Sequence, residues 1–286
     1  MSADAATSWP APAKLNLMLH IVGRRSDGYH LLQTVFQFLD YADELYFRVT
    51  DDGIIERSGE WANIPADADL TLRAARLLQQ VTRCTKGVRI TLAKRIPIGG
   101  GLGGGSSDAA TALLALNQLW DVRLSIEQLA ALGLQLGADV PFFLRGRAAV
   151  GEGIGDVLTP IDPPERWYAV AVPPVAVPTA EVYAAFAREN RLTPLSLPRT
   201  IRDLREGYGR NDLEAVVRKR YPAVERAFQY LAPWQPRLTG SGGCVFVNVG
   251  DPAEGQRVLA GLPAGFTGFV ARGMNRHPLL GSARTQ

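Results

Sequence analysis

The sequence predicts an α+β protein with two domains, on three observations. The chain has 286 residues, which is long for one compact domain and sufficient for two. Strand patterns and helix patterns are intermixed, without the strict strand–helix–strand alternation that is typical of a parallel α/β sheet. The composition changes near residue 165, and Pro163 and Pro164 indicate a boundary close by.

The first 60 residues are mostly strand-like. The stretch KLNLMLHIV (14–22) alternates, with its leucines on one face. The opposite face is expected to carry Lys14, Asn16, Met18 and His20. The turn-rich sequence GRRSDGY (23–29) then leads into two further extended stretches, at 31–40 and at 44–50.

The remaining elements follow from apolar periodicity and from capping residues. Helices are predicted at 69–83, at 106–120 with serine and aspartate at its start, at 125–137 with Ser125 as N-cap, at 179–191, at 212–231 with an interruption at Pro222, and at 252–262. Strands are predicted at 87–97, at 166–174, after a second glycine turn within 236–251, and at 267–274.

The stretch IPIGGGLGGGSSDAA (96–110) contains six glycines and lies between a predicted strand and a predicted helix. Exposed N–H groups at a helix N-terminus attract an anion, and glycine allows phosphate oxygens to reach the backbone. Ser106 and Ser107 would add hydroxyl donors. The alternative is a tight turn that packs a helix against a sheet, but six glycines exceed what a turn needs. We therefore expect a phosphate-binding loop.

Three better-known phosphate loops do not fit this stretch. A Walker A loop requires lysine before Ser or Thr, and GGGSS has none. Gly99, Gly101 and Gly104 match G-x-G-x-x-G, but a second helix follows where a dinucleotide fold needs a strand ending in an acidic residue. The V-A-I-K, H-R-D and D-F-G motifs of protein kinases are missing from the sequence.

Composition and charge limit the possible functions. The apolar fraction is 47% and the charged fraction 21%, as in ordinary globular proteins. A net charge of +3 without a block of like charges gives little support for nucleic-acid binding and suits a small anionic ligand. Cys84 and Cys244 show no metal-ligand or disulfide spacing, and two buried thiols in a reducing cytosol are expected. No signal peptide, membrane span or zinc site is predicted.

Three motifs, in order, resemble those of the galactokinase, homoserine kinase, mevalonate kinase and phosphomevalonate kinase superfamily. The sequence PAKLNLMLHIVGRRSDGYH (12–30) is similar to its N-terminal motif, PIGGGLGGGSSDAA (97–110) to its central motif, and LTGSGGCVFV (238–247) to its C-terminal glycine turn. The resemblance implies transfer of the γ-phosphoryl group of ATP to a substrate hydroxyl, with Mg²⁺. It also implies an ATP-binding domain at 1–160 like domain 2 of ribosomal protein S5, a ferredoxin-like domain at 161–286, and an active site between them.

The resemblance narrows to the members that act on cytidine-diphosphate methylerythritol in the non-mevalonate route to isoprenoid precursors. It is carried by AKLNL, GRRSDGYHLLQTVFQFLD, GGGLGGGSSDAA and GADVPFFL, covers nearly the whole chain, and is weakest between 185 and 235. It implies a cytoplasmic kinase that phosphorylates the 2-hydroxyl of the methylerythritol unit. The partners would be this substrate and ATP, with no nucleic acid and no membrane. Oligomeric state is not predicted.

Two residues match the catalytic lysine and aspartate of the family. Asp139, in GADVPFF, is expected in a short turn between an apolar helix and an apolar strand, where an acid is either a cap or a functional group. Lys14, in PAKLNL, is either a lysine at a strand end or a cation that keeps Asp139 ionised and lowers the pKa of the substrate hydroxyl. The resemblance favours the functional role for both.

The resemblance also assigns two sets of binding residues. Tyr29 and His30 would hold the cytosine ring, and the full substrate-binding set is Asn16, Tyr29, His30, Thr179, Tyr183, Gly240, Ser241 and Gly242. The ATP-binding set is Leu70, Lys94, Pro97, Ile98, Gly99, Gly100, Gly101, Leu102, Gly103, Gly104, Gly105, Ser106 and Ser107.

Two positions depart from the family pattern. Asp69 stands where the family usually has an asparagine that contacts adenine, so Leu70 and Lys94 are expected to make that contact instead. Asp108 stands where asparagine or alanine is common, and a carboxylate there would repel phosphate at close range unless Mg²⁺ lies nearby.

Three other functions are considered. A superfamily kinase with a mevalonate-like or homoserine-like substrate would need no pocket for a base, and DGYH (27–30) argues against it. A non-catalytic nucleotide or RNA binder would not need both Lys14 and Asp139. A nicotinamide oxidoreductase depends on the G-x-G-x-x-G match alone.

Overall fold

The computed structural model describes residues 7–26, 28–59, 65–189 and 209–281. The strands are β1 (Trp9–Arg24), β2 (His30–Thr50), β3 (Ile55–Arg57), β4 (Gly87–Ala93), β5 (Ala149–Glu152), β6 (Val157–Pro160), β7 (Trp167–Val172), β8 (Arg237–Leu238), β9 (Val245–Val249) and β10 (Thr267–Met274). The helices are α1 (Leu70–Thr82), α2 (Gly104–Leu119), α3 (Ile126–Leu136), α4 (Val140–Arg145), α5 (Thr179–Glu189), α7 (Glu214–Arg220), α8 (Pro222–Leu231), α9 (Pro252–Ala260), α10 (Pro278–Gly281) and the 3₁₀ turn η1 (Ala232–Trp234).

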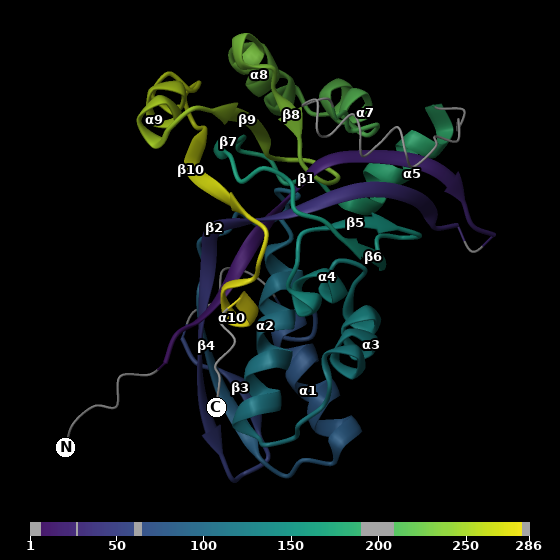
Figure 1. Cartoon of the computed structure of the whole chain (residues 1–286), viewed down its shortest axis with the longest axis vertical. Helices are drawn as coiled ribbons and strands as arrows, with labels where there is room; N and C mark the ends of the chain where they lie inside the picture. Colours follow the sequence, from purple (N-terminus) through teal and green to yellow (C-terminus); the bar gives the residue numbers. More distant parts are fainter. Residues whose placement is uncertain (1–6, 27, 60–64, 190–208, 282–286) are drawn as a thin grey trace.

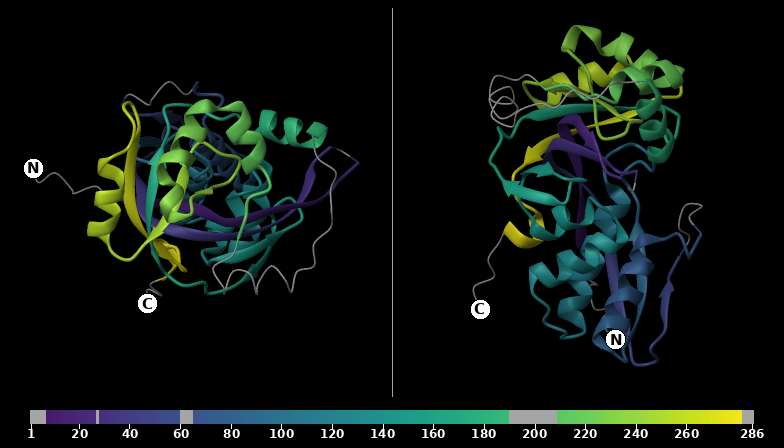
Figure 2. Two further views of the ribbon diagram at one scale, coloured as in Figure 1. Left: turned by 90° about the horizontal axis from the view of Figure 1, so that it is seen from above. Right: turned by 90° about the vertical axis from the view of Figure 1, so that its right-hand side faces the viewer.

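The described residues form a mixed α/β fold around one ten-stranded mixed sheet (Figure 1). The main path of hydrogen-bonded strands is β3-β4-β2-β10-β7-β9-β8, and β1 and the β5–β6 hairpin join it at β2. The β3–β4 pair is parallel, whereas the other paired strands are antiparallel. Helices α1 to α4 lie at one end of the molecule, and α7, α8 and α9 lie at the other (Figure 2).

Strand β2 connects the two ends of the sheet. It is 21 residues long, where two separate extended stretches were predicted. Residues 30–45 of β2 pair with β1, 34–36 also pair with β5, 44–50 pair with β4, and Phe38 and Leu39 pair with β10. A single strand therefore carries both the helical end and the end that contains β7 to β10.

Strand β1 follows the predicted alternation only at its start. Its pairing with β2 shifts between Pro12 and Lys14, between Asn16 and Met18, and between Ile21 and Gly23. A β-bulge reverses the faces of all residues beyond it. The prediction that Met18 and His20 share a face with Lys14 is therefore wrong: Met18 is buried among apolar residues, and Leu19 reaches the face that carries Lys14 and Asn16.

Most predicted elements are present, with two corrections. The helix expected from residue 106 begins at Gly104, because the left-handed Gly103 ends the preceding loop. The apolar run after Asp139 forms helix α4, not a strand, with proline in its first turn. The helix expected at 179–191 is described as far as Glu189, and its last two residues, like Asp27 of the DGYH motif, lie outside the described residues.

Capping residues account for the helix ends. Ser125, the predicted N-cap, accepts from the backbone N–H of Gln128, and the Gln128 side chain accepts from the N–H of Ser125, which makes a capping box. Pro222 separates α7 from α8 as expected, since proline cannot continue a hydrogen-bonded helix from its N-terminal side. These local signals are independent of the tertiary fold, which is why the sequence predicts them.

Apolar side chains gather in three clusters. One packs α1 to α4 against β2 and β4, and stacked Phe38 and Phe142, with ring centroids 4.3 Å apart, lie within it. A second packs α5, α7 and α8 against β7 and β9. The third joins β1 and β2 to β7 and β9, and includes Leu15 and Phe246. Cys244 is buried in this third cluster, whereas Cys84 is only partly buried, so the expectation of two buried thiols is wrong for Cys84.

In the described ranges no helix is both long and apolar enough to cross a membrane. The division at residue 160 and the two named subdomains stay predictions.

We expect acid to weaken the fold through His277. This histidine is fully buried just before α10, and its Nδ1 accepts from the backbone N–H of Leu279 at 3.1 Å. Burial lowers the pKa of His277 from 6.5 to about 4. Between these pH values the unfolded chain binds more protons than the folded chain. The free energy of unfolding therefore falls as the pH drops from 6.5 to 4, by up to about 3 kcal/mol.

Urea unfolding at pH 7.5 and pH 4.5, for the wild type and for His277→Asn, measures this contribution. Asparagine keeps an acceptor for the Leu279 N–H but does not titrate. The wild type should lose more stability than the variant on acidification, and an equal loss in both proteins would rule out His277 as the cause.

Candidate active site

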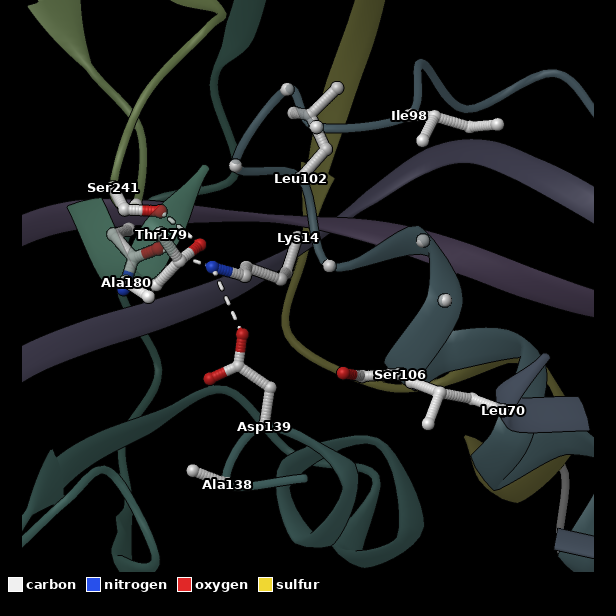
Figure 3. Close-up of a pocket in the computed structure, with 18 of the residues that line it drawn as sticks. Lys14, Leu70, Ile98, Leu102, Ser106, Ala138, Asp139, Thr179, Ala180 and Ser241 are labelled. Carbon is white, nitrogen blue, oxygen red and sulfur yellow. Dashed lines mark hydrogen bonds and ion pairs between the residues drawn. The ribbon is translucent and has the colours of Figure 1, made fainter. Parts of the chain in front are cut away.

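A cavity of about 930 Å³ lies where the glycine-rich segment, β1, β2 and α5 meet (Figure 3). All the predicted site residues line it except Ser107 and Gly242. Residues from the helical end and from the end that contains α5 and the second glycine turn therefore face one space. The structure brings the three sequence motifs together.

The glycine loop, residues 95–103, leads from β4 into α2. Gly103 is the N-cap of α2 and has a φ of 72°, a conformation that favours glycine. The first N–H groups of a helix have no acceptor within the helix, and here they belong to Gly104, Gly105 and Ser106, all of which line the cavity. This end of α2 is built to receive an anion.

The two adjacent serines have different surroundings. Ser106 lines the cavity, and Figure 3 shows its hydroxyl on the cavity side of α2. Ser107 is fully buried, and its Oγ has no hydrogen-bond partner. The prediction that Ser107 offers a hydroxyl to the ligand is therefore not supported by its position, because α2 begins two residues earlier than expected and turns Ser107 inward.

The two glycine turns pack backbone to backbone. A Cβ on Gly101, whose φ is 77°, would lie 2.2 Å from the carbonyl oxygen of Thr239. The turns are hydrogen-bonded as well: the N–H of Cys244 donates to the carbonyl of Gly100 at 3.0 Å, and the Thr239 hydroxyl donates to the carbonyl of Gly101 at 3.3 Å. Part of the glycine content thus serves this contact rather than ligand access.

Asn211 holds the second turn from the other side. Its Nδ2 donates to the carbonyls of Gly240 at 2.7 Å and Leu238 at 3.1 Å, and its Oδ1 accepts from the N–H of Leu213. Asn211 lies in no motif that the sequence analysis used, and only the tertiary structure assigns it this place.

Lys14 and Asp139 meet in the middle of the cavity. The Lys14 Nζ lies 3.4 Å from Oδ2 of Asp139 and donates to Oδ1 of Asn16 (Figure 3). The Lys14 side chain is only 4% exposed, whereas that of Asp139 is 32% exposed. Asp139 makes no capping bond to α4, so its carboxylate is free of the structural role that the sequence left open. The pair presents a carboxylate to the cavity with a buried cation behind it.

Asn16 is fixed by a short chain of hydrogen bonds. Its Nδ2 donates to the hydroxyl of Thr34 at 2.7 Å, and that hydroxyl donates to the carbonyl of Met18 at 2.6 Å. The backbone N–H of Asn16 donates to the hydroxyl of Thr239 at 3.1 Å. Lys14 and Asn16 share one face of β1, as predicted.

Aromatic side chains form the end of the cavity next to α5. The rings of His30 and Tyr183 are 5.2 Å apart at 34°, and Tyr29 is 61% exposed at the rim. Burial, followed by the charge of Arg24, lowers the pKa of His30, and burial raises the pKa of Tyr183. Both rings are therefore neutral near pH 7. The Nε2 of His30 is buried and has no hydrogen-bond partner.

Thr179 and Ser241 close the same end. Their hydroxyls lie 2.7 Å apart, and both face the cavity (Figure 3). Thr179 begins α5, and Ser241 belongs to the second glycine turn. This hydrogen bond links the aromatic end to the interlocked turns.

Acidic residues at the opposite end have structural partners. Asp69 caps α1 by accepting from the N–H groups of Thr71 and Leu72, while Leu70 lines the cavity beside it. Asp108 accepts from the Lys94 Nζ at 2.6 Å. The cation beside it reduces the repulsion of phosphate that the sequence suggested for Asp108.

Several further residues line the cavity that the sequence analysis did not assign to the site, although some lie within its motifs. They are Leu19, Gly28, Leu32, Thr34, Phe36, Ala68, Thr71, Leu92, Ala138, Ile154 and Ala180. Most are apolar or small, and the tertiary fold brings them to the cavity wall.

Comparison with known proteins identifies the same region. Residues 69–147 match the family model of the GHMP kinases N terminal domain. A protein of Alkalilimnicola ehrlichii named 4-diphosphocytidyl-2-C-methyl-D-erythritol kinase is 55% identical over 277 residues, 96% of this chain and 94% of that protein. A protein of Aromatoleum aromaticum with the same name is 51% identical over 273 residues, 95% of each chain.

Solved structures agree with the sequence comparison. A crystal structure of 4-(cytidine 5'-diphospho)-2C-methyl-D-erythritol kinase superposes with a TM-score of 0.80 at 35% identity, over 93% of this chain and 99% of that one. A mevalonate kinase superposes with a TM-score of 0.66 at 17% identity, over 95% of this chain and 100% of that one. The second likeness shows a shared fold.

We expect the glycines of the loop to fall into two classes on substitution. Gly101→Ala places a methyl group against the Thr239 carbonyl at a positive φ, and should lower the free energy of unfolding by about 3 kcal/mol or more. Gly105→Ala meets no atom closer than 3.6 Å and adds a helix-favouring residue, so stability should stay equal or rise by up to about 1 kcal/mol.

Thermal and urea unfolding of both variants measures the difference. A stable Gly101→Ala variant would show that the two turns do not need to pack at this distance.

Proposed function

Because the chain belongs to the family of 4-diphosphocytidyl-2-C-methyl-D-erythritol kinases, we propose that one cavity binds ATP at the glycine loop and the cytidine substrate at the aromatic end. The protein is an ATP-dependent kinase of the non-mevalonate route to isoprenoid precursors. It transfers the γ-phosphoryl group to the 2-hydroxyl of 4-diphosphocytidyl-2-C-methyl-D-erythritol. The observation that carries the proposal is the Lys14–Asp139 pair between the N-terminus of α2 and the His30–Tyr183 rings.

The glycine loop binds the phosphates of ATP. The free N–H groups at the start of α2 and the positive end of its dipole attract the triphosphate, and the Ser106 hydroxyl adds a donor or an oxygen ligand. Gly105 leaves the approach to this helix end open. Leu70 supplies an apolar surface for the nucleotide at the start of α1.

Mg²⁺ accompanies ATP in this proposal. Magnesium takes oxygen ligands and is usually held by one or two protein groups together with phosphates, so a dedicated cluster of acidic residues is not required. Ser106 and Asp139 offer such oxygens on the cavity wall. The ion supplies neutralisation of phosphate charge when it is bound.

Lys14 and Asp139 act on the acceptor hydroxyl. Asp139 accepts the proton of the 2-hydroxyl as the oxygen attacks the γ-phosphorus, and the Lys14 ammonium stabilises the negative charge that develops. The Lys14 ammonium also donates to Oδ1 of Asn16, which helps to fix its position. Burial of Lys14 against the Phe36 ring, 5.4 Å from Nζ to the centroid, restricts its position further.

The aromatic end recognises cytosine. Tyr29 and Tyr183 provide ring faces for stacking, and a neutral His30 offers one donor and one acceptor to the edge of the base. Thr179 and Ser241 supply hydroxyls between the base and the reacting groups. A substrate without a base would leave these groups unused, which favours the cytidine compound over mevalonate or homoserine.

The finer domain description and the localisation are part of this proposal. We place an S5 domain 2-like, ATP-binding domain at 1–160 and a ferredoxin-like domain at 161–286. The separate apolar clusters around α1 to α4 and around α5, α7 and α8 support this division. A cytoplasmic location accords with the use of ATP and with two cysteines that form no disulfide.

We expect Asp139→Asn to lower kcat by about 10²- to 10⁴-fold, because an amide cannot accept the hydroxyl proton. The melting temperature should fall moderately, since buried Lys14 loses its charged partner but keeps its hydrogen bond to Asn16. Steady-state kinetics with ATP and the cytidine substrate measures the effect. Asp162→Asn, which alters an exposed pair with Arg147, is the matched control and should retain full activity. Unchanged kcat in Asp139→Asn would exclude proton acceptance by this residue.

The substrate assignment predicts selective turnover. ATP consumption is measured with 4-diphosphocytidyl-2-C-methyl-D-erythritol, mevalonate and homoserine in the presence of Mg²⁺, and the cytidine compound alone should be phosphorylated. Turnover of mevalonate or homoserine would support the assignment of the phosphate loop and contradict the assignment of the cytosine pocket. A folded protein that binds ATP but phosphorylates none of the three would instead be a non-catalytic binder.

A further inference from the structure

The start of the glycine loop is held by a buried carboxylate on β2. Asp43 is fully buried, and its Oδ1 accepts from the backbone N–H groups of Arg95 at 2.6 Å and Ile96 at 2.8 Å. These are the first two residues after Lys94, where the chain leaves β4 and enters the loop. Two charge-assisted hydrogen bonds to consecutive N–H groups fix the direction in which the loop departs.

The same carboxylate reaches the end of the loop through Lys94. The Lys94 Nζ donates to Oδ2 of Asp43 at 2.6 Å and to Oδ2 of Asp108 at 2.6 Å. Asp108 lies in α2, one turn after its first residue, Gly104. A Cβ on Gly104 would lie 3.0 Å from the Lys94 Nζ, so the ammonium is packed against the N-terminus of the helix. We call Asp43, Lys94 and Asp108 the loop clamp.

The charges of the loop clamp are balanced for a site that must accept an anion. Burial raises the pKa of Asp108 to about 8, although the Lys94 charge opposes this shift. Burial would lower the pKa of Lys94, but the carboxylates of Asp108 and Asp43 outweigh it and raise the pKa. The charge of Lys94 and the raised pKa of Asp108 both oppose a build-up of negative charge beside the N-terminus of α2.

We propose that Asp43 and Asp108 are positioning residues for the triphosphate of ATP, acting through Lys94 and through the main chain of the loop. The clamp sets the distance between the loop and the first turn of α2, and the phosphates must contact both at once. This inference rests on the proposed function, because it takes the loop to be the phosphate site.

The position of the clamp separates it from acceptor binding. It joins β2, β4 and α2, whereas the aromatic end is formed by Tyr29, His30 and Tyr183, with Tyr183 on α5. Lys94 also donates two of its three ammonium protons to the carboxylates, which leaves only one for a direct hydrogen bond to ATP. Loss of the clamp should therefore raise the KM for ATP and leave the KM for the cytidine substrate unchanged.

The first test is Asp43→Asn. Asparagine keeps an oxygen for the N–H groups of Arg95 and Ile96, but its NH₂ group faces Lys94 and breaks the link to α2. We expect the KM for ATP to rise by about 10-fold, since one charge-assisted hydrogen bond is lost. The KM for the cytidine substrate should change by less than about 2-fold, because substitutions far from a binding site usually have effects no larger than this.

The second test replaces the other end of the clamp. Asp108→Ala removes the acceptor for Lys94 at a helical position that alanine favours, so this variant should fold even if Asp43→Asn does not. It should also raise the KM for ATP. Asp108→Asn keeps an oxygen for Lys94 and should restore most of the wild-type KM. This rescue separates the clamp from a simple loss of packing.

Asp52→Asn is the matched control. The Asp52 carboxylate also accepts a backbone N–H, from Ile54 at 2.9 Å, and faces Arg89, but it lies just beyond the end of β2 and does not line the cavity. It should leave both KM values unchanged. Melting temperatures of all variants are recorded beside the kinetics.

The outcomes separate this inference from the proposed function. A wild type that phosphorylates the cytidine substrate, with variants whose KM for ATP is unchanged, would overturn the clamp alone. Variants that lose stability and raise both KM values equally would overturn it as well, because the role would be structural. A wild type without kinase activity would instead contradict the proposed function.

Discussion

The cavity depends on the contact between the two glycine turns. Gly101 and Thr239 are 138 residues apart in the chain, yet no side-chain atom fits between them. Because this contact is made by backbone atoms, its geometry cannot adjust by a change of rotamer. The hydroxyl of Thr239 extends it to Asn16, and the hydroxyl of Ser241 extends it to Thr179. The phosphate end, the reacting groups and the aromatic end thus share one rigid support.

The charged side chains at the cavity are paired with one another. Each lysine at the cavity is at least partly buried and has a carboxylate beside it: Lys14 has Asp139, and Lys94 has Asp43 and Asp108. Burial of an unpaired charge would cost several kcal/mol, so pairing is needed before ATP arrives. The two lysines differ in what they leave open. Asp139 keeps part of its carboxylate in the cavity, whereas the carboxylate of Asp43 is turned wholly toward protein groups.

Local sequence signals predicted most of the longer helices and the N-cap Ser125, because each depends on neighbours within a few positions. The face of Met18 was not predictable, since bulges in β1 arise from its pairing with β2. Which of Ser106 and Ser107 faces the cavity depends on where α2 begins, a difference of two residues that is within the usual uncertainty of helix ends. Asp43 and Asn211 lie outside all motifs, because their roles are set by distances across the fold.

The length of β2 has a consequence for how this chain can vary. The strand contributes Thr34 to the support of Asn16, Phe36 to the wall beside Lys14, and Asp43 to the start of the glycine loop. Successive residues of a strand point to opposite faces, so one inserted or deleted residue between Phe36 and Asp43 would turn one set away from its target. Length changes among relatives should therefore accumulate in the connecting loops, while the spacing within β2 stays constant.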